Sequence, residues 1–299
     1  MSGHHHSSSH AVSAAGKHRS RLAITFALVA GFFAVELIAA LRSGSLALLG
    51  DAGHMAADVT TLGAALLALH LAPLRDKRGR RTFGNYRVEV FASGLAVLIM
   101  LGVAIFITVE AIGRFGSAVE PASGIMLAVG ILGLVINVVS MLLLRRGSSE
   151  SLNVKGAYLE VLADALGSIG VIAAAVLVSV TGSPWWDTVI ALGIAAFIAV
   201  RAVMLGLEVL RVLAECAPPG IEPAEIQVAL EDIPGMLEVH DLHVWQLTSG
   251  MNVASAHIVT NAPDTMLAAQ HLLRDDFGIA HVTLQTESAN RRECDHTDW

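Results

Sequence analysis

Six apolar runs follow one another through the first two thirds of the chain. They extend over residues 22–41, 45–71, 88–112, 123–144, 153–180 and 186–213. Each run has roughly the 20 residues that an α-helix needs to cross the hydrocarbon core of a bilayer. The connections between them are short. The pattern therefore predicts six membrane-spanning helices, with both ends of this region on the same side of the membrane.

The pattern changes near residue 214, where Pro218-Pro219-Gly220 ends the last apolar run. Beyond it, short segments rich in β-branched residues alternate with helical patterns. The expected elements are two helices, at residues 223–230 and 264–277, and three strands, at residues 237–247, 253–260 and 281–286. The order helix, strand, strand, helix, strand predicts a small α+β domain that is ferredoxin-like, with its first strand missing or irregular.

Composition supports a membrane protein, because only 15% of the 299 residues are charged and 54% are hydrophobic, whereas soluble domains have about 25% charged residues. We expect a disordered His-rich arm at residues 1–20, a transmembrane domain at 21–213 and a soluble domain at 214–299. The arm is either a metal-scavenging segment or part of an expression tag. Three consecutive histidines make a poor tag, which favours the first reading.

Basic residues gather in alternate connections. The segment at residues 75–81 is strongly basic, whereas the connections on the opposite side hold only Arg42 and Arg114. By the positive-inside rule, both termini are therefore expected in the cytoplasm. The formal net charge of −7 does not indicate nucleic acid as a partner, because basic residues lie in short loops and acidic ones in the tail.

Ionisable residues interrupt two of the apolar runs at helical spacing. Asp51, His54 and Asp58 lie at i, i+3 and i+7, and so share one helix face. Glu160 and Asp164 are four residues apart in a later run. A charge at the bilayer centre costs roughly 2.5–3.5 kcal/mol unless it faces protein or a water-filled cavity. If the two helices face each other, one nitrogen ligand and three carboxylates meet, which predicts a divalent-metal site.

Such a site would also couple metal to protons. Metal ligands must be deprotonated, so metal binding displaces protons and proton binding displaces metal. Asp51 is either a ligand, a partner that orients His54, or an acid paired with a basic residue, and the roles outside direct ligation are favoured. Asn153, seven residues before Glu160, either lines the entry path or caps its helix.

Four segments resemble the cation diffusion facilitator family, whose members export zinc and related divalent cations. They are residues 51–58, 82–89, 110–114 and 239–245. The resemblance covers almost the whole chain after residue 20. It implies a homodimer in a lipid bilayer, six membrane helices per protomer, a cytoplasmic ferredoxin-like domain and exchange of metal for protons. Together with the compact loops, it favours a bacterial plasma membrane.

The resemblance assigns His54 and Asp58 to the first half of the transport site, and Glu160 and Asp164 to the second half. The zinc-exporting pattern has His where Glu160 stands. With His54 neutral, three carboxylates (−3) and one divalent ion (+2) sum to −1 instead of zero. Oxygen-rich sites favour manganese and other hard cations, although zinc also accepts carboxylate ligands. We expect Zn²⁺ as the substrate, with Mn²⁺, Co²⁺, Cd²⁺ or Fe²⁺ as alternatives.

The tail carries further candidate ligands. The resemblance matches His240 and His257 to positions that bind regulatory metal in the family, with Glu287 as a weaker candidate. His240 and His243 are an odd number of residues apart on an expected strand, so they should face opposite sides, and one of them should be structural.

Two other classes of protein remain as alternatives. One is a membrane-anchored metal sensor, against which six spans with an internal ionisable cluster argue. The other is a membrane metalloenzyme, which needs an open coordination position and a general base. No separate base stands out in the sequence. The expected function is transport, not catalysis.

Overall fold

The computed structural model describes residues 9–71, 80–114, 120–145, 152–248, 250–262 and 264–287. They form two compact units, which are treated separately below. The first, the helical unit, contains Met1–Gly79 and Ala92–Gly206, and the second, the C-terminal unit, contains Arg80–Phe91 and Leu207–Trp299.

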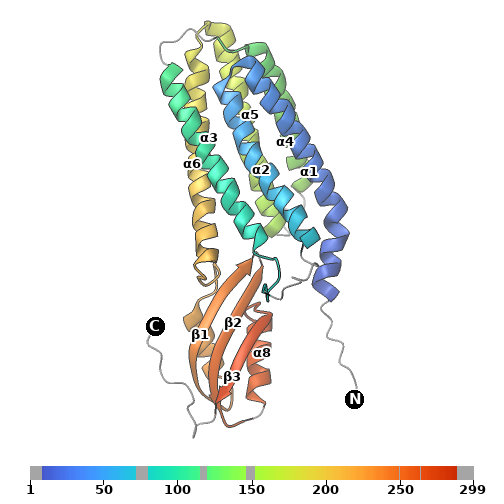
Figure 1. Ribbon diagram of the computed structural model, residues 1–299, viewed down its shortest axis with the longest axis vertical. Helices are drawn as coiled ribbons and strands as arrows, with labels where there is room; N and C mark the ends of the chain where they lie inside the picture. Colours follow the sequence, from blue (N-terminus) through green and yellow to red (C-terminus); the bar gives the residue numbers. More distant parts are fainter. Residues whose placement is uncertain are drawn as a thin grey trace. The chain divides into compact units, whose positions relative to one another are not determined.

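Long helices account for the apolar runs, and they lie alongside one another in Figure 1. They are α1 (Ser9–Ser43), α2 (Leu46–Leu71), α3 (Val88–Arg114), α4 (Ser123–Leu144), α5 (Leu152–Thr181) and α6 (Trp185–Leu213). The His-rich arm expected at residues 1–20 overlaps the first helix, since residues 9–20 belong to α1. Residues 1–8 of the expected arm lie outside the described residues.

Five helices in the described ranges are long and apolar enough to cross a membrane: α1, α3, α4, α5 and α6. The sequence predicts six, and α2 is not among the five found in the described ranges. Large apolar side chains are exposed on the helices, among them Leu98, Phe106, Val200 and Met204. Exposed apolar surface of this extent is expected where lipid surrounds the protein. The chain is an integral membrane protein.

The start of α2 is fixed to the start of α6 by Asp187. This carboxylate accepts a bond from Ser45 Oγ at 2.6 Å and from the backbone N–H groups of Leu46 and Ala47 at 2.8 and 3.2 Å. Ser45 Oγ in turn accepts from Leu48 N at 3.0 Å. Asp187 is only 2% exposed. It satisfies backbone donors that a helix N-terminus leaves without intrahelical partners, and its negative charge suits that end of the helix dipole.

Two glycines let the neighbouring helices approach α2 closely. A Cβ atom at Gly53 of α2 would overlap the Val103 side chain of α3, and one at Gly167 of α5 would overlap Asp51 Oδ1. Any larger residue at these positions would push the helices apart. The face of α2 that carries the ionisable stripe is therefore held tightly within the helical unit.

The C-terminal unit contains a three-stranded sheet. Its elements are α7 (Pro223–Glu231), β1 (Met236–Thr248), β2 (Met251–Thr260), α8 (Thr265–Asp275) and β3 (His281–Glu287). The strand order is β1-β2-β3, with β1 antiparallel and β3 parallel to β2. Both helices lie on one face of this sheet (Figure 1), and the core between them includes Ile226, Leu230, Ile258, Leu273 and Ile279. The element order agrees with the sequence prediction.

The segment before α3 and the first residues of that helix belong to the C-terminal unit. Arg87 Nη2 lies 2.7 Å from Glu215 Oε1, and Thr248 Oγ1 donates to Glu89 Oε2 at 2.9 Å. The sequence analysis places residues 80–91 in the transmembrane domain, because it follows the apolar runs and cannot detect such long-range polar contacts.

Candidate metal-transport site

Three ionisable side chains meet between α2 and α5. His54 and Asp58 lie one turn apart on α2, and Asp164 projects from α5. His54 Nε2 is 3.1 Å from Asp164 Oδ1 and 3.9 Å from Asp58 Oδ2. One ligand atom from each residue lies within 4.8 Å of the others. A single divalent ion can bridge atoms at this spacing, because zinc–nitrogen and zinc–oxygen bonds are about 2.0–2.2 Å long.

A cation that the sequence analysis missed reaches the same cluster. Arg201 of α6 places Nη1 2.7 Å from His54 Nε2. A guanidinium group has only donors, so Arg201 donates and the lone pair of His54 Nε2 accepts. The ring proton of His54 then lies on Nδ1. The signal in the sequence was an Arg in the middle of the sixth apolar run, and an intramembrane charge of this kind indicates function by default.

The cluster is largely shielded from solvent. The His54 side chain is 6% exposed, whereas those of Asp58 and Asp164 are 22% and 24% exposed. Two atoms in it, His54 Nδ1 and Asp164 Oδ1, are buried without a hydrogen-bond partner among the described residues. Buried polar atoms without partners are rare, because desolvation costs free energy that no bond returns. For Asp164 Oδ1, an ion in the cluster would be such a partner.

The other residues expected at this site do not belong to the three-residue cluster among the described side chains. Asp51 is buried at 7% exposure, lies against Gly167 and interacts with Glu36 of α1, but it is not part of the three-residue cluster. Glu160 and Asn153 belong to α5, and their side chains lie outside the described residues. The structure thus brings together three of the four expected ligands.

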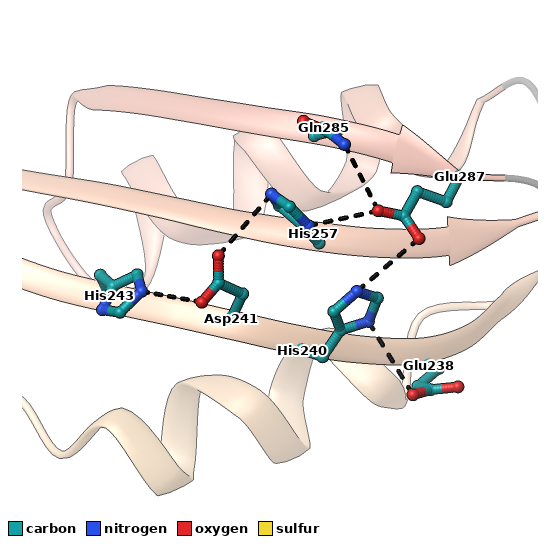
Figure 2. Close-up of polar contacts among 7 residues, drawn as sticks. All are labelled: Glu238, His240, Asp241, His243, His257, Gln285 and Glu287. Carbon is teal, nitrogen blue, oxygen red and sulfur yellow. Dashed lines mark hydrogen bonds and ion pairs between the residues drawn. The ribbon is translucent and has the colours of Figure 1, made fainter. Parts of the chain in front are cut away.

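A second cluster lies in the C-terminal unit, on the sheet face opposite α7 and α8. Figure 2 shows the carboxylate of Glu287, on β3, in contact with both His240 of β1 and His257 of β2. Glu287 Oε1 is 3.2 Å from His257 Nδ1, and Glu287 Oε2 is 3.7 Å from His240 Nε2. Ligand atoms of the three residues lie within 4.8 Å of one another. The structure therefore groups all three residues that the sequence analysis considers for a metal in the tail.

A β-bulge in β1 overturns the expectation for His243. His240 pairs with His257 and His243 with Ser255, so three steps on β1 match two steps on β2. The extra residue, Asp241, has φ 53°, a left-handed conformation that Asp tolerates better than most residues. Because of the bulge, His240 and His243 face the same side of the sheet. Side-chain alternation alone could not reveal this.

The bulge also places Asp241 within the second cluster. Its carboxylate lies 2.9 Å from His243 Nε2 and 3.7 Å from His257 Nε2 (Figure 2). Asp241 thus links a more exposed histidine, His243, to one of the candidate ligands. The sequence analysis missed this residue, since an acid next to a histidine on a strand carries no signal without the bulge.

Apolar helices around one metal-ligand cluster, and a small sheet domain with another, define a membrane protein that handles metal ions. Residues 22–214 match the profile described as the cation efflux transmembrane domain. Residues 218–289 match that of the cation efflux protein cytoplasmic domain. The chain belongs to the cation efflux family, also called the cation diffusion facilitators.

Three relatives are similar to this chain over nearly its full length. The metal cation efflux system protein CzcD of Cupriavidus metallidurans is 40% identical over 285 residues, covering 94% of this chain and 90% of that protein. The cadmium, cobalt and zinc/H(+)-K(+) antiporter of Bacillus velezensis is 36% identical over 295 residues, covering 96% and 92%. The zinc transporter ZitB of Escherichia coli is 36% identical over 290 residues, covering 95% and 91%.

Proposed function

We propose that this protein exports divalent metal ions, with Zn²⁺ as the main substrate, in exchange for protons. The transport site consists of His54, Asp58, Glu160 and Asp164. The observation that carries this proposal is the meeting of His54, Asp58 and Asp164 on two apolar helices, with ligand atoms within 4.8 Å of one another. Glu160 completes the set because it lies one turn before Asp164 on α5.

The ligand chemistry fits zinc and leaves related ions open. Zinc accepts imidazole nitrogen and carboxylate oxygen in four-ligand sites. The names of the relatives include zinc, cadmium and cobalt, which supports these ions as substrates. The third carboxylate that Glu160 would add makes the site harder, so Mn²⁺ and Fe²⁺ remain alternatives.

Exchange follows from competition for the same atoms. Each carboxylate and the His54 imidazole binds either a proton or the metal, so a high proton concentration favours metal release. If the site opens alternately to the two sides of the membrane, a proton gradient drives the metal against its own gradient. The word antiporter in the name of the Bacillus relative supports this coupling. Asp51, buried on the same face of α2, does not bind the metal in this proposal.

We also propose a topology for the whole chain. Residues 21–213 form a six-span domain in which α2 spans the membrane together with the five apolar helices. The ionisable residues Asp51 and His54 do not exclude a span, because they are buried in protein. Basic residues at 75–81 favour cytoplasmic termini and a bacterial inner membrane. The domain at 214–299 is a ferredoxin-like remnant, since loss of the first of four strands leaves a helix, two strands, a helix and a strand.

The C-terminal domain, in this proposal, mediates a homodimer and holds a regulatory or structural metal. His240, His257 and Glu287 fit such a metal, because Glu287 Oε2, which lies 3.7 Å from His240 Nε2, is buried without a hydrogen-bond partner among the described residues. Two nitrogens and one oxygen suit zinc. When bound, the metal would link β1, β2 and β3 through their side chains.

Metal flux in proteoliposomes under an imposed pH gradient tests the transport proposal. Wild-type protein should move Zn²⁺ and respond to the gradient, and Asp164→Ala should reduce the flux to background while the dimer stays intact. Glu208→Ala is the matched control, since this exposed carboxylate of α6 lies outside the cluster. Metal binding without flux in the wild type would instead favour the sensor, and metal-dependent hydrolysis would favour the enzyme.

A further inference from the structure

Arg201 forms a hydrogen bond to the nitrogen atom of His54 that a transported metal would need as a ligand. Its Nη1 lies 2.7 Å from His54 Nε2, the same nitrogen that faces Asp164 and Asp58. We propose that Arg201 is a tethered cation of the transport site, which competes with the metal for His54 and balances the charge of the third carboxylate. This inference rests on the proposed transport function and deepens it.

Competition follows from the lone pair. His54 Nε2 has one lone pair, and it cannot accept a hydrogen bond from a guanidinium and bind a metal ion at the same time. His54 Nδ1 offers no alternative, because it carries the ring proton when Nε2 accepts from Arg201. Metal binding through His54 Nε2 therefore requires the Arg201 guanidinium to withdraw, and its return would help to release the ion.

The position of Arg201 allows such a movement. Ile198 and Ala202, its neighbours on α6, pack in one buried cluster with Ala57 of α2. These contacts keep the helix backbone next to the site. The arginine side chain has several rotatable bonds and can move its charged end by some ångströms through rotamer changes alone. Arg201 is partly exposed, so rotamer changes can move its guanidinium while the backbone of α6 stays in place.

Charge balance gives Arg201 its second role. With His54 neutral, the three carboxylates Asp58, Glu160 and Asp164 contribute −3 and a divalent ion +2. The sum is −1, which is costly inside a membrane. Arg201 is always protonated and brings the sum to zero. The zinc-exporting pattern with His in place of Glu160 would need no such cation.

Metal affinity and transport rate, measured together, test this inference. In the purified full-length protein, Arg201→Gln should bind Cd²⁺ and Zn²⁺ at least about tenfold more tightly, because a competitor and a like charge are gone. In proteoliposomes its apparent KM should fall while its maximal rate also falls about tenfold, since release becomes slow. Arg201→Lys should retain much of the wild-type behaviour. Arg211→Gln, an exposed arginine of the same helix, should change neither quantity.

Reciprocal rescue provides the sharper test. Glu160→His alone should leave a surplus positive charge and weaken metal binding and flux. Combined with Arg201→Gln, it should restore flux to within about threefold of the wild type, because the site is neutral again. If Arg201→Gln does not fold, Arg201→Met, of similar length, replaces it in both measurements.

The outcomes separate this inference from the transport proposal. Unchanged or weaker metal binding by Arg201→Gln, or a double variant slower than either single variant, overturns the role of Arg201 while wild-type flux stands. Absence of wild-type flux overturns the transport proposal itself, and the binding measurement still decides whether Arg201 competes with the metal.

Discussion

Removing the Asp187 carboxylate should destabilise the helical unit and weaken the transport site. Asp187→Ala deletes the acceptor of three bonds, from Ser45 Oγ, Leu46 N and Ala47 N, at 2.6, 2.8 and 3.2 Å. Two backbone N–H groups at the start of α2 then lose their partner in a buried position. The first turn of α2 should loosen, and with it the link between α2 and α6.

The expected loss can be bounded from these contacts. A hydrogen bond to a charged group contributes about 1.5–3 kcal/mol in soluble proteins, whereas interhelical bonds in a membrane protein average about 0.6 kcal/mol. For three bonds shared by one buried carboxylate, we expect the free energy of unfolding to fall by about 3 kcal/mol. Ser45→Ala removes one of these bonds and the one to Leu48 N, and should cost about 1 kcal/mol.

Reversible unfolding in mixed detergent micelles, titrated with a denaturing detergent, measures these free energies. Asp187→Asn keeps one acceptor oxygen and should lie between the wild type and Asp187→Ala. Flux should decline in the same order, because His54 on α2 and Arg201 on α6 depend on the link. A loss below about 1 kcal/mol for Asp187→Ala would refute the reasoning, since backbone donors at the helix start would then have other acceptors.

Two further substitutions test close packing and the second cluster. Gly167→Ala should separate α5 from α2 by forcing a methyl group onto Asp51 Oδ1, and so reduce flux at least about tenfold while costing about 1–3 kcal/mol of stability. His257→Ala should weaken Zn²⁺ binding at the C-terminal cluster at least about tenfold, read by calorimetry, and reduce the rise in unfolding temperature that Zn²⁺ produces, because Glu287 loses one of its two histidine neighbours.

Each of these has a matched control in the chain. Gly170→Ala lies one turn further along α5, where an added Cβ meets the side chains of α6 at ordinary contact distances of 3.6 Å or more, and it should leave flux unchanged. Equal damage from both glycine variants would mean that the contact with Asp51 is not the cause, because Ala itself favours the helix more than Gly does. His271→Ala removes an exposed histidine of the same unit. If it weakens zinc binding as much as His257→Ala, the three-residue site is wrong.

The helices and strands were predictable because each corresponds to a continuous local pattern of apolar or β-branched residues. Apolar runs of spanning length gave the bounds of α2 to α6 to within a few residues, and β-branched segments gave the three strands. The grouping of His54 with Asp58 and Asp164 was also accessible, since helical spacing places the residues of each helix on one face. In these cases the signal lies within about seven residues of sequence.

Features that depend on distant contacts or irregular backbone were not predictable. The bulge at Asp241 changes the side to which the following residues of β1, up to Gln246, point, and no alternation pattern predicts it. Arg201 carried a signal, an isolated charge in an apolar run, but nothing in the sequence said which residue it would face. In the sequence, Asp187 is likewise an ordinary acid in the first turn of a helix. Its role became clear only from its contact with the start of α2.

The two clusters differ in how their ligands are held, and this difference suits different fates of an ion. His54 and Asp164 come from separate helices, whose backbone hydrogen bonds are internal, so α2 and α5 can shift against each other without breaking any of them. His240, His257 and Glu287 come from three strands joined by backbone hydrogen bonds, which fix their spacing. A site between two separate helices, with the competing arginine that we propose, is suited to releasing its ion. A site on a hydrogen-bonded sheet is built to keep one.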